Sequence, residues 1–341
     1  GLFWGNKSRC SLLLDYLGKP VDMPVNKGLG FVDCRDNSIY QVQPREPYKW
    51  QTEHGYRETL AALRSMGQLS MEECAAAMQI DVQTWLEERG LTKNEEAYDY
   101  IKVVMACQNA MAEPRMAPAG DFLGYMAMAR DIKMNLHSGS VATIAEPGCM
   151  AIPLAIEEAL NEAGGEIRRS TPVEEVIVED GKIRGVIIPS QDGGYDNIEC
   201  DTVICNIPPK HIFNVLHPRH FPAKWVNLLQ NKYWSAGLLS CYMGLKNNIW
   251  EGFGVDERSF IWMPGIIKHE GFIGAVDMVM WNFAACAKRA PEGKRDFCFS
   301  TALTDQEMRN PKKVTRVINY CMDWFKRNFK GWEENVEFVI W

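Results

Sequence analysis

The sequence predicts a fold of the α/β (α+β) class, and three observations support that prediction. Strand-like pieces occupy residues 28–43 and end at Pro44 and Pro47. From about residue 56 to residue 135 the sequence becomes rich in Ala, Met, Leu and Glu, which favours helices. Strand patterns return near Thr143 and alternate with two more helices. With 341 residues, the chain is long enough for a sizeable core and two lobes.

The N-terminal half begins with a short helix over residues 8–18, which starts at Ser8 or Ser11 and stops at Gly18 and Pro20. After the strand-like pieces, four stretches have helical character, with breaks at Gly67, at Gly90 and from Pro114 to Pro118: 71–79, 81–90, 95–112 and 121–134. We expect these stretches to form a helical lobe inserted between β segments.

The second half starts with a helix that has Pro153 in its first turn and ends at Gly164 and Gly165. Its predicted inward side chains are Leu154, Ile156, Ala159, Leu160 and Ala163. Strands are expected at 176–179, 182–188, 198–205, 238–245, 259–263, 272–281, 296–303 and 336–341. A last helix is capped by Asn310 and Pro311, stops at Gly331, and carries apolar residues at helical spacing: Val314, Val317, Ile318, Cys321, Phe325 and Phe329.

Composition and charge exclude several classes of protein. The net charge of -7 and the lack of a Lys/Arg run argue against a nucleic-acid partner. No apolar stretch approaches the roughly 18 to 20 residues of an integral membrane segment, and there is no signal peptide. The eleven cysteines are scattered without a C-x-x-C pair, which predicts reduced core thiols in a cytoplasmic protein and no metal site. His217 and His220 could be metal ligands, but Pro218 forbids the helix that would align them.

Two stretches carry a resemblance to a known family. Residues 146–188 combine a glycine-containing entry, a helix, a G-G-x-I turn and a hairpin with D-G-x-x-x-G-V, and residues 201–216 follow with D-x-V-I before a Pro-containing turn. This order resembles the middle of phytoene desaturase and amine oxidase type FAD-dependent oxidoreductases. The matching positions are Gly148, Gly164, Gly165, Ile167, Thr171, Val173, Val176, Asp180, Gly181, Gly185, Val186, Asp201, Val203, Ile204, Asn206 and Pro208.

The resemblance implies an FAD/NAD(P)-binding-like flavoprotein core with a mixed substrate-domain sheet and an inserted helical lobe. That core is incomplete, because neither Gly28 and Gly30 nor Gly252 and Gly254 complete a G-x-G-x-x-G phosphate-binding fingerprint. Both ends of the chain look cut, and we expect the fingerprint to lie upstream of Gly1. The implied division is the start of the substrate sheet at 1–50, the helical lobe at 51–140, the FAD-domain segment at 141–215, and the substrate sheet with the terminal helix at 216–341.

By resemblance, four residues belong to an incomplete FAD site. The backbone of Val173 would face the adenine edge, while Asn206, Ile207 and Pro208 would form a chain reversal under the cofactor. For Val173 the alternative is a buried β residue in a hairpin, and for Asn206 it is a turn residue that satisfies its own backbone.

The residues that would carry out catalysis are not identified. Amine oxidases of this type place a Lys near the flavin in a stretch that is here Ser235, Ala236 and Gly237, which weighs against amine oxidation. The resemblance therefore favours hydride transfer or desaturation on an apolar small molecule, and a non-catalytic ligand-binding or partner subunit is the alternative. Seven side chains could line an apolar channel or simply fill a sheet core: Trp262, Met263, Phe272, Met278, Met280, Trp281 and Phe283.

Overall fold

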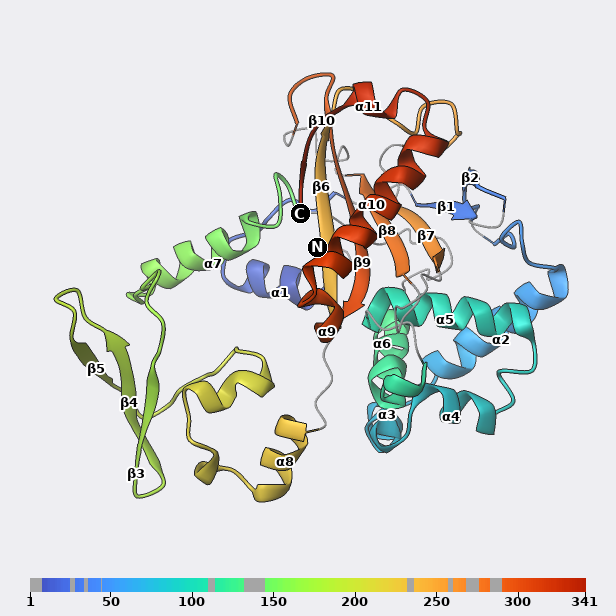
Figure 1. Cartoon of the computed structure of the whole chain (residues 1–341). Helices are drawn as coiled ribbons and strands as arrows, with labels where there is room; N and C mark the ends of the chain where they lie inside the picture. Colours follow the sequence, from blue (N-terminus) through green and yellow to red (C-terminus); the bar gives the residue numbers. More distant parts are fainter. Residues whose placement is uncertain are drawn as a thin grey trace. The chain divides into compact units, whose positions relative to one another are not determined.

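The computed structural model describes residues 8–24, 28–33, 36–43, 45–109, 114–131, 145–231, 236–256, 260–267, 276–282 and 290–341. Two compact units divide the chain: one combines residues 1–159 with 236–341, and the other holds residues 160–235 (Figure 1).

Helices occupy the range of the predicted lobe and of the predicted terminal helix, whereas α8, α9 and α11 were not expected. They are α1 (Arg9–Tyr16), α2 (Glu53–Gly67), α3 (Met71–Ala76), α4 (Val82–Glu88), α5 (Glu95–Asn109), α6 (Ala119–Asp131), α7 (Ala151–Glu162), α8 (Ala223–Asn231), α9 (Asp305–Met308), α10 (Pro311–Asn328) and α11 (Trp332–Asn335). Short 3₁₀ turns are η1 (Ala77–Gln79), η2 (Pro114–Met116), η3 (Pro209–Asn214) and η4 (Pro218–His220). Within the described residues, no helix is both long enough and apolar enough to cross a bilayer.

The strands form two sheets. The strands are β1 (Leu29–Asp33), β2 (Ser38–Gln41), β3 (Glu175–Glu179), β4 (Lys182–Pro189), β5 (Tyr195–Glu199), β6 (Ala236–Leu245), β7 (Phe260–Ile267), β8 (Val276–Asn282), β9 (Arg295–Thr304) and β10 (Val336–Ile340). A seven-stranded sheet has the order β10-β6-β9-β8-β7-β1-β2, and a three-stranded sheet has the order β3-β4-β5. In the larger sheet only β1 and β7 pair in parallel, so the sheet is mixed, as the sequence predicts.

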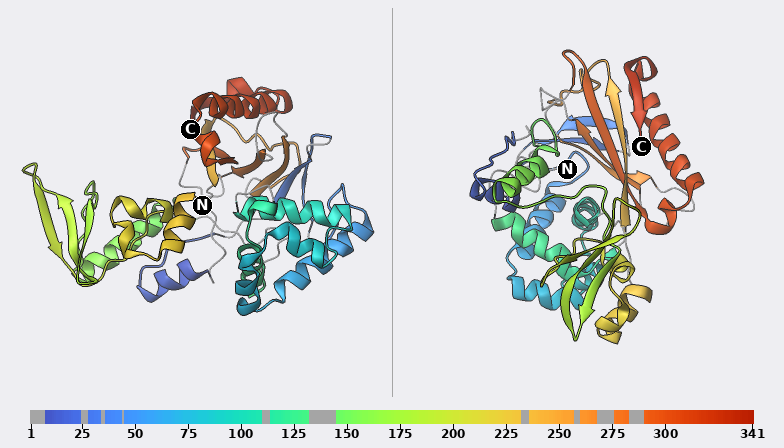
Figure 2. Two further views of the ribbon diagram at one scale, coloured as in Figure 1. Left: turned by 60° about the horizontal axis from the view of Figure 1, so that its bottom comes forward. Right: turned by 90° about the vertical axis from the view of Figure 1, so that its left-hand side faces the viewer.

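Helix α10 covers one face of the larger sheet, and Figure 2 shows it running along the strands. Asn310 caps the helix by accepting from the backbone N–H groups of Lys312 and Lys313. The predicted apolar stripe is confirmed, because Val317, Cys321 and Phe325 are fully buried. The Phe325 ring stacks on Trp332 at 4.8 Å and lies 5.4 Å from Phe299 of β9.

Helices α2 to α6 pack around a second apolar core, which β1 joins through Leu29 and Phe31 while Val32 joins the core beneath α10. Side-chain caps begin these helices at Thr52, Ser70 and Asp81.

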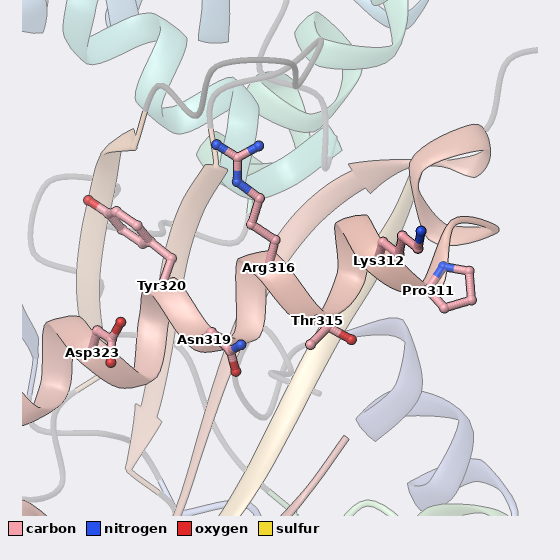
Figure 3. Close-up of a pocket in the computed structure, with 7 residues that line it drawn as sticks. All are labelled: Pro311, Lys312, Thr315, Arg316, Asn319, Tyr320 and Asp323. Carbon is pink, nitrogen blue, oxygen red and sulfur yellow. The ribbon is translucent and has the colours of Figure 1, made fainter.

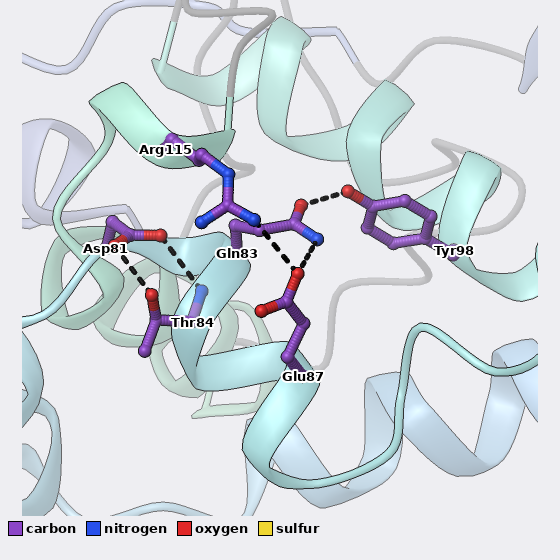
Figure 4. A network of polar contacts seen from close by, with 6 residues as sticks. All are labelled: Asp81, Gln83, Thr84, Glu87, Tyr98 and Arg115. Atoms are coloured by element: carbon purple, nitrogen blue, oxygen red, sulfur yellow. Dashed lines mark hydrogen bonds and ion pairs between the residues drawn. The ribbon is translucent and has the colours of Figure 1, made fainter.

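A polar network ties α4 to α5 and η2 (Figure 4). Gln83 accepts from the Tyr98 hydroxyl and donates to Glu87 at 2.6 Å, and Arg115 pairs with Glu87 at 3.1 Å. Burial raises the pKa of Asp81, but hydrogen bonds from Thr84 outweigh that effect, so the net pKa is lowered. The contacts are structural, because every group in the network has a partner within the lobe.

Two sequence expectations are wrong in an instructive way. Leu154, Ile156 and Leu160 of α7 are exposed instead of inward, at 51%, 36% and 40%. The third strand of the small sheet was predicted at 198–205, but it covers Tyr195–Glu199. It starts earlier because the Asp192–Gly193–Gly194 turn leads directly into pairing with β4. Beyond Glu199 the chain has no strand beside it among the described residues.

Candidate cofactor site

The β3–β4 hairpin supports the predicted site. Asp180 and Gly181 have φ values of 50° and 73°, the left-handed pair that a two-residue turn requires, and Glu179 pairs with Lys182 across it. The hairpin therefore has the tight, fixed geometry that the D-G dipeptide predicts.

Val173 lies two residues before β3. The residue that follows it, Glu174, donates its backbone N–H to the Ile187 carbonyl of β4 at 2.9 Å. Val173 itself is 40% exposed, so it is not the buried hairpin residue that the alternative required. Within the described part of the chain, neither its N–H nor its C=O forms a hydrogen bond. The residue thus presents one free donor and one free acceptor beside a small apolar side chain.

Asn206, Ile207 and Pro208 form an exposed bend that leads into η3. Pro208 adopts φ -53° and ψ 134° and accepts from the His211 N–H at 2.8 Å, so the chain turns here as predicted. No hydrogen bond of Asn206 is present within the described residues, so the structure gives no bond to its own backbone.

One backbone contact connects this bend to the hairpin. The N–H of Val176 in β3 donates to the carbonyl of Val215, one residue after η3, at 2.7 Å. The structure therefore attaches the strand that follows Val173 to the segment that follows Pro208.

Sequence reasoning missed a further feature of this region, the exposure of its apolar side chains. Ile204 is 93% exposed and Ile167 is 43% exposed, and of the described hydrophobic residues at 160–235 only Val176, Ile188 and Leu229 are buried. The signal was present in the apolar run Val203-Ile204-Cys205, which reads as a strand but extends past the last strand of the hairpin sheet.

Outside this region, the buried thiols of the larger sheet and α10 are part of the core and not reactive groups. Burial raises the pKa of Cys241 to about 12, that of Cys298 to about 11, and that of Cys321 further, so these thiols stay protonated and unreactive at neutral pH. The described cysteines form no disulfides. Among them, Cys205 differs from the three buried thiols above because its side chain is exposed.

The imidazole of His217 accepts from the Arg219 N–H at 3.1 Å, and no group of three or more metal-ligating side chains occurs in the described ranges. Ala236 and Gly237, which belong to the stretch where the resemblance led us to look for a Lys, are the first two residues of β6. The structure does not describe the side chains of Trp262, Met263, Met278, Met280 and Trp281, nor any part of Phe272 and Phe283, so their channel role stays a prediction.

The residues at 160–235 fit one end of a dinucleotide and not its centre. A free backbone donor and acceptor on an extended residue match the polar edge of an adenine ring, and the open apolar surroundings match its faces. A glycine-rich loop at a helix N-terminus, which would hold a pyrophosphate, is absent from the sequence.

Part of the chain is similar in sequence to two phytoene desaturases. Phytoene desaturase (neurosporene-forming) of Rhodobacter capsulatus is 31% identical over 111 residues, and the zeta-carotene-forming phytoene desaturase of Myxococcus xanthus is 32% identical over 100 residues. These matches cover 31% and 29% of this chain, and they span only 20% and 18% of the two relatives.

Solved structures show the same fold over nearly the whole chain. An oxidoreductase from Methanosarcina mazei matches with a TM-score of 0.67 and 14% identity over 99% of this chain and 74% of its own. Putrescine oxidase bound to putrescine matches with a TM-score of 0.64 and 13% identity over 96% of this chain and 70% of its own.

The model of the family described as flavin-containing amine oxidoreductase matches residues 46–340, which is most of the chain. The flavoprotein fold class predicted from the sequence is therefore confirmed, and FAD is the cofactor that goes with it. The chain belongs to the flavin-containing amine oxidoreductase family, a family of FAD-dependent oxidoreductases.

Proposed function

We propose that this chain is the middle part of an FAD-dependent oxidoreductase that carries out hydride transfer or desaturation on an apolar small molecule. The observation that carries the proposal is the free backbone edge of Val173 within a segment that has the family's order of motifs. The matched phytoene desaturases support an apolar substrate. A cytoplasmic location is supported by the described cysteines, which are not in disulfides.

Each part of the site has a physical role. The Val173 N–H would donate to an adenine ring nitrogen, and its C=O would accept from the adenine amino group, as a paired base would do. Asn206, Ile207 and Pro208 would turn the chain beneath the cofactor, since Pro208 cannot continue a strand. FAD, when bound, would supply the two-electron chemistry.

The proposal requires that residues outside this chain hold the pyrophosphate. The exposed Leu154, Leu160 and Ile204 support this requirement, because apolar side chains of this number are normally covered by another lobe. The purified chain of 341 residues should therefore elute from gel filtration without flavin. A yellow protein with one FAD per chain in its visible spectrum would contradict the missing-loop argument.

A matched pair of variants at Val173 tests the adenine contact in a longer protein that includes this chain and binds FAD. Val173→Ala changes only the side chain and should leave the affinity nearly intact. Val173→Pro removes the N–H donor, and an unpaired polar edge costs about 1 to 3 kcal/mol, or roughly five- to two-hundred-fold in Kd. Circular dichroism and melting of both variants control for misfolding. If a folded Val173→Pro protein titrates FAD as well as its parent, the adenine assignment is wrong.

The alternative, a non-catalytic ligand-binding or partner subunit, rests on the lack of an identified acid or base. Reduction of bound flavin by an apolar substrate under anaerobic conditions separates the two functions, because a binding subunit would leave the flavin spectrum oxidised.

A further inference from the structure

Helix α10 has a second face whose charge is opposite to that of the protein. Between residues 309 and 330 the only acidic residue is Asp323, although the chain as a whole has a net charge of -7. The basic residues of this segment are Arg309, Lys312, Lys313, Arg316, Lys326, Arg327 and Lys330. We call them the α10 basic stripe. On α10 itself, Lys312, Arg316, Lys326 and Arg327 are exposed on the side away from the buried Val317, Cys321 and Phe325, and Lys313 is half-buried. Arg309 and Lys330 flank the two ends of the helix.

The central part of the stripe borders an open groove of about 610 Å³. Figure 3 shows the side chains that line it, which extend from successive turns of α10: Pro311, Lys312, Thr315, Arg316, Asn319, Tyr320 and Asp323. Lys312, Arg316 and Lys330 are exposed, and no carboxylate within the described residues pairs with them. By contrast, Lys313 lies 3.9 Å from Glu307, and Lys326 lies 2.7 Å from Glu333.

The helix dipole explains Lys326 and Arg327, which lie in the last turn of α10, but it does not explain the cations of the first turn. Lys312 and Lys313 occupy the first turn, where the positive end of the helix dipole disfavours cations, and that turn contains no acidic residue. The first turn therefore carries an electrostatic cost that an external negative charge would relieve.

We propose that the α10 basic stripe docks this protein on a membrane surface rich in anionic lipids. The inference rests on the proposed function in one respect: an apolar small-molecule substrate partitions into a bilayer, so a protein that uses it gains from lying on that surface. No part of α10 needs to enter the bilayer, because its apolar face is already occupied by the sheet.

The length of the stripe favours a surface over a single bound ion. Helix α10, from Pro311 to Asn328, rises about 27 Å, a length that many lipid headgroups can match and one phosphate cannot. A lipid surface is favoured over nucleic acid, because only the lipid can also hold the apolar substrate of the proposed function.

Vesicle flotation with the 341-residue chain tests the proposal. Vesicles of phosphatidylcholine mixed with phosphatidylglycerol should bind the protein at about 0.1 M salt and release it at about 1 M salt, where the Debye length falls to about 3 Å. Vesicles of phosphatidylcholine alone should not bind it. Equal binding to both kinds of vesicle would overturn the proposal.

A triple variant locates the surface. Lys312→Gln, Arg316→Gln and Lys330→Gln together should weaken binding to anionic vesicles at least about ten-fold, because each cation near an anionic surface contributes measurably. Its melting temperature should be unchanged or raised, since Lys312 opposes the helix dipole.

A second triple variant controls for net charge by removing three exposed cations elsewhere: Arg64→Gln, Lys182→Gln and Lys224→Gln. This control should bind vesicles within about two-fold of the parent. Equal losses in both triple variants would show that overall charge, and not the stripe, controls binding, and would overturn the proposal. So would retention of duplex DNA in place of vesicles. These measurements need no flavin, so failure of the FAD assignment and failure of membrane docking are distinguishable.

Discussion

The two compact units of this protein differ in how far their apolar side chains are buried. In the seven-stranded sheet, Phe297 and Phe299 of β9 are buried against Phe325 of α10. In residues 160–235, Ile204 is almost fully exposed and Val173 is 40% exposed. Burial of apolar area supplies most of the free energy of folding, at about 25 cal/mol per Å². The larger sheet therefore contains its own stabilising core, whereas the segments beside the small sheet that hold Val173 and Ile204 present apolar surface suited to contact with another surface.

The largest expected effect separates the two regions directly. Phe325→Ala should destabilise the protein by about 3 to 5 kcal/mol, because it leaves a cavity where the ring contacts Phe299 and Trp332. Ile204→Ala should change the free energy of unfolding by less than about 0.5 kcal/mol. Urea unfolding followed by tryptophan fluorescence measures both, and Phe325→Leu provides a milder variant if Phe325→Ala does not fold. Similar losses from Ile204→Ala and Phe325→Ala would show that the small sheet has a core of its own.

Two glycines without room for a side chain give the next largest effect. A Cβ added to Gly244 would lie 2.3 Å from the Phe338 ring, and one added to Gly185 would lie 2.5 Å from the Ile198 carbonyl oxygen. Each Gly→Ala change should cost about 1 to 3 kcal/mol. Because the first clash is with a side chain, adding Phe338→Ala should restore most of the loss from Gly244→Ala. The clash at Gly185 is with backbone, so no truncation should rescue it. If Phe338→Ala does not raise the melting temperature of the Gly244→Ala protein, the Phe338 ring does not cover Gly244.

A smaller effect tests whether the regions unfold together. Gly331 after α10 and Gly181 in the hairpin turn have φ values of 71° and 73°, with nothing within 3.5 Å of an added Cβ. Alanine at either position should cost about 1 kcal/mol through the backbone alone. We expect Gly331→Ala to lower the main calorimetric transition and Gly181→Ala to leave it unchanged, because residues 160–235 form a separate compact unit. A shift of the main transition by Gly181→Ala would show coupled unfolding.

The thiols give an effect that is absent at neutral pH. Cys205 is exposed and should react with a thiol reagent in the native protein, whereas Cys241 and Cys298 should react only after unfolding. Burial raises the pKa of these two from 9.0 to about 12 and about 11. The folded protein thus keeps thiol protons that the unfolded chain loses above pH 9. The contribution of these two thiols to the free energy of unfolding is therefore full below pH 9 and falls as the pH rises towards 11 and 12. Cys241→Ala should make the free energy of unfolding fall less steeply with pH over this range. If the fall is unchanged, other groups cause it.

Sequence reasoning succeeded where local patterns and burial agree. Asn310 and Pro311 predict the start of α10, and the spacing of Val317, Cys321 and Phe325 predicts its buried side. The Asp180-Gly181 dipeptide predicts the hairpin turn because only a few residues tolerate positive φ.

Sequence reasoning failed where apolar residues are not buried within the chain. The pattern of Leu154, Ile156 and Leu160 predicts a buried face, but a pattern contains no information about which surface meets it. For the same reason Ile204 was expected in a strand, since apolar runs signal strands even when the partner strand is absent. The free backbone of Val173 was expected only from the family resemblance, because a strand pattern does not show which backbone groups stay unpaired.

The pairing of β1 with β7 has a consequence for how the chain folds during synthesis. Helices α2 to α6 follow one another along the chain and can fold as soon as they are made, but Leu29 of β1 must wait for Phe260 of β7. The β1–β2 hairpin therefore keeps an unpaired strand edge throughout the synthesis of residues 160–235. An open edge of this kind invites pairing with other chains, so the rate of translation through the intervening segment should govern the yield of soluble protein.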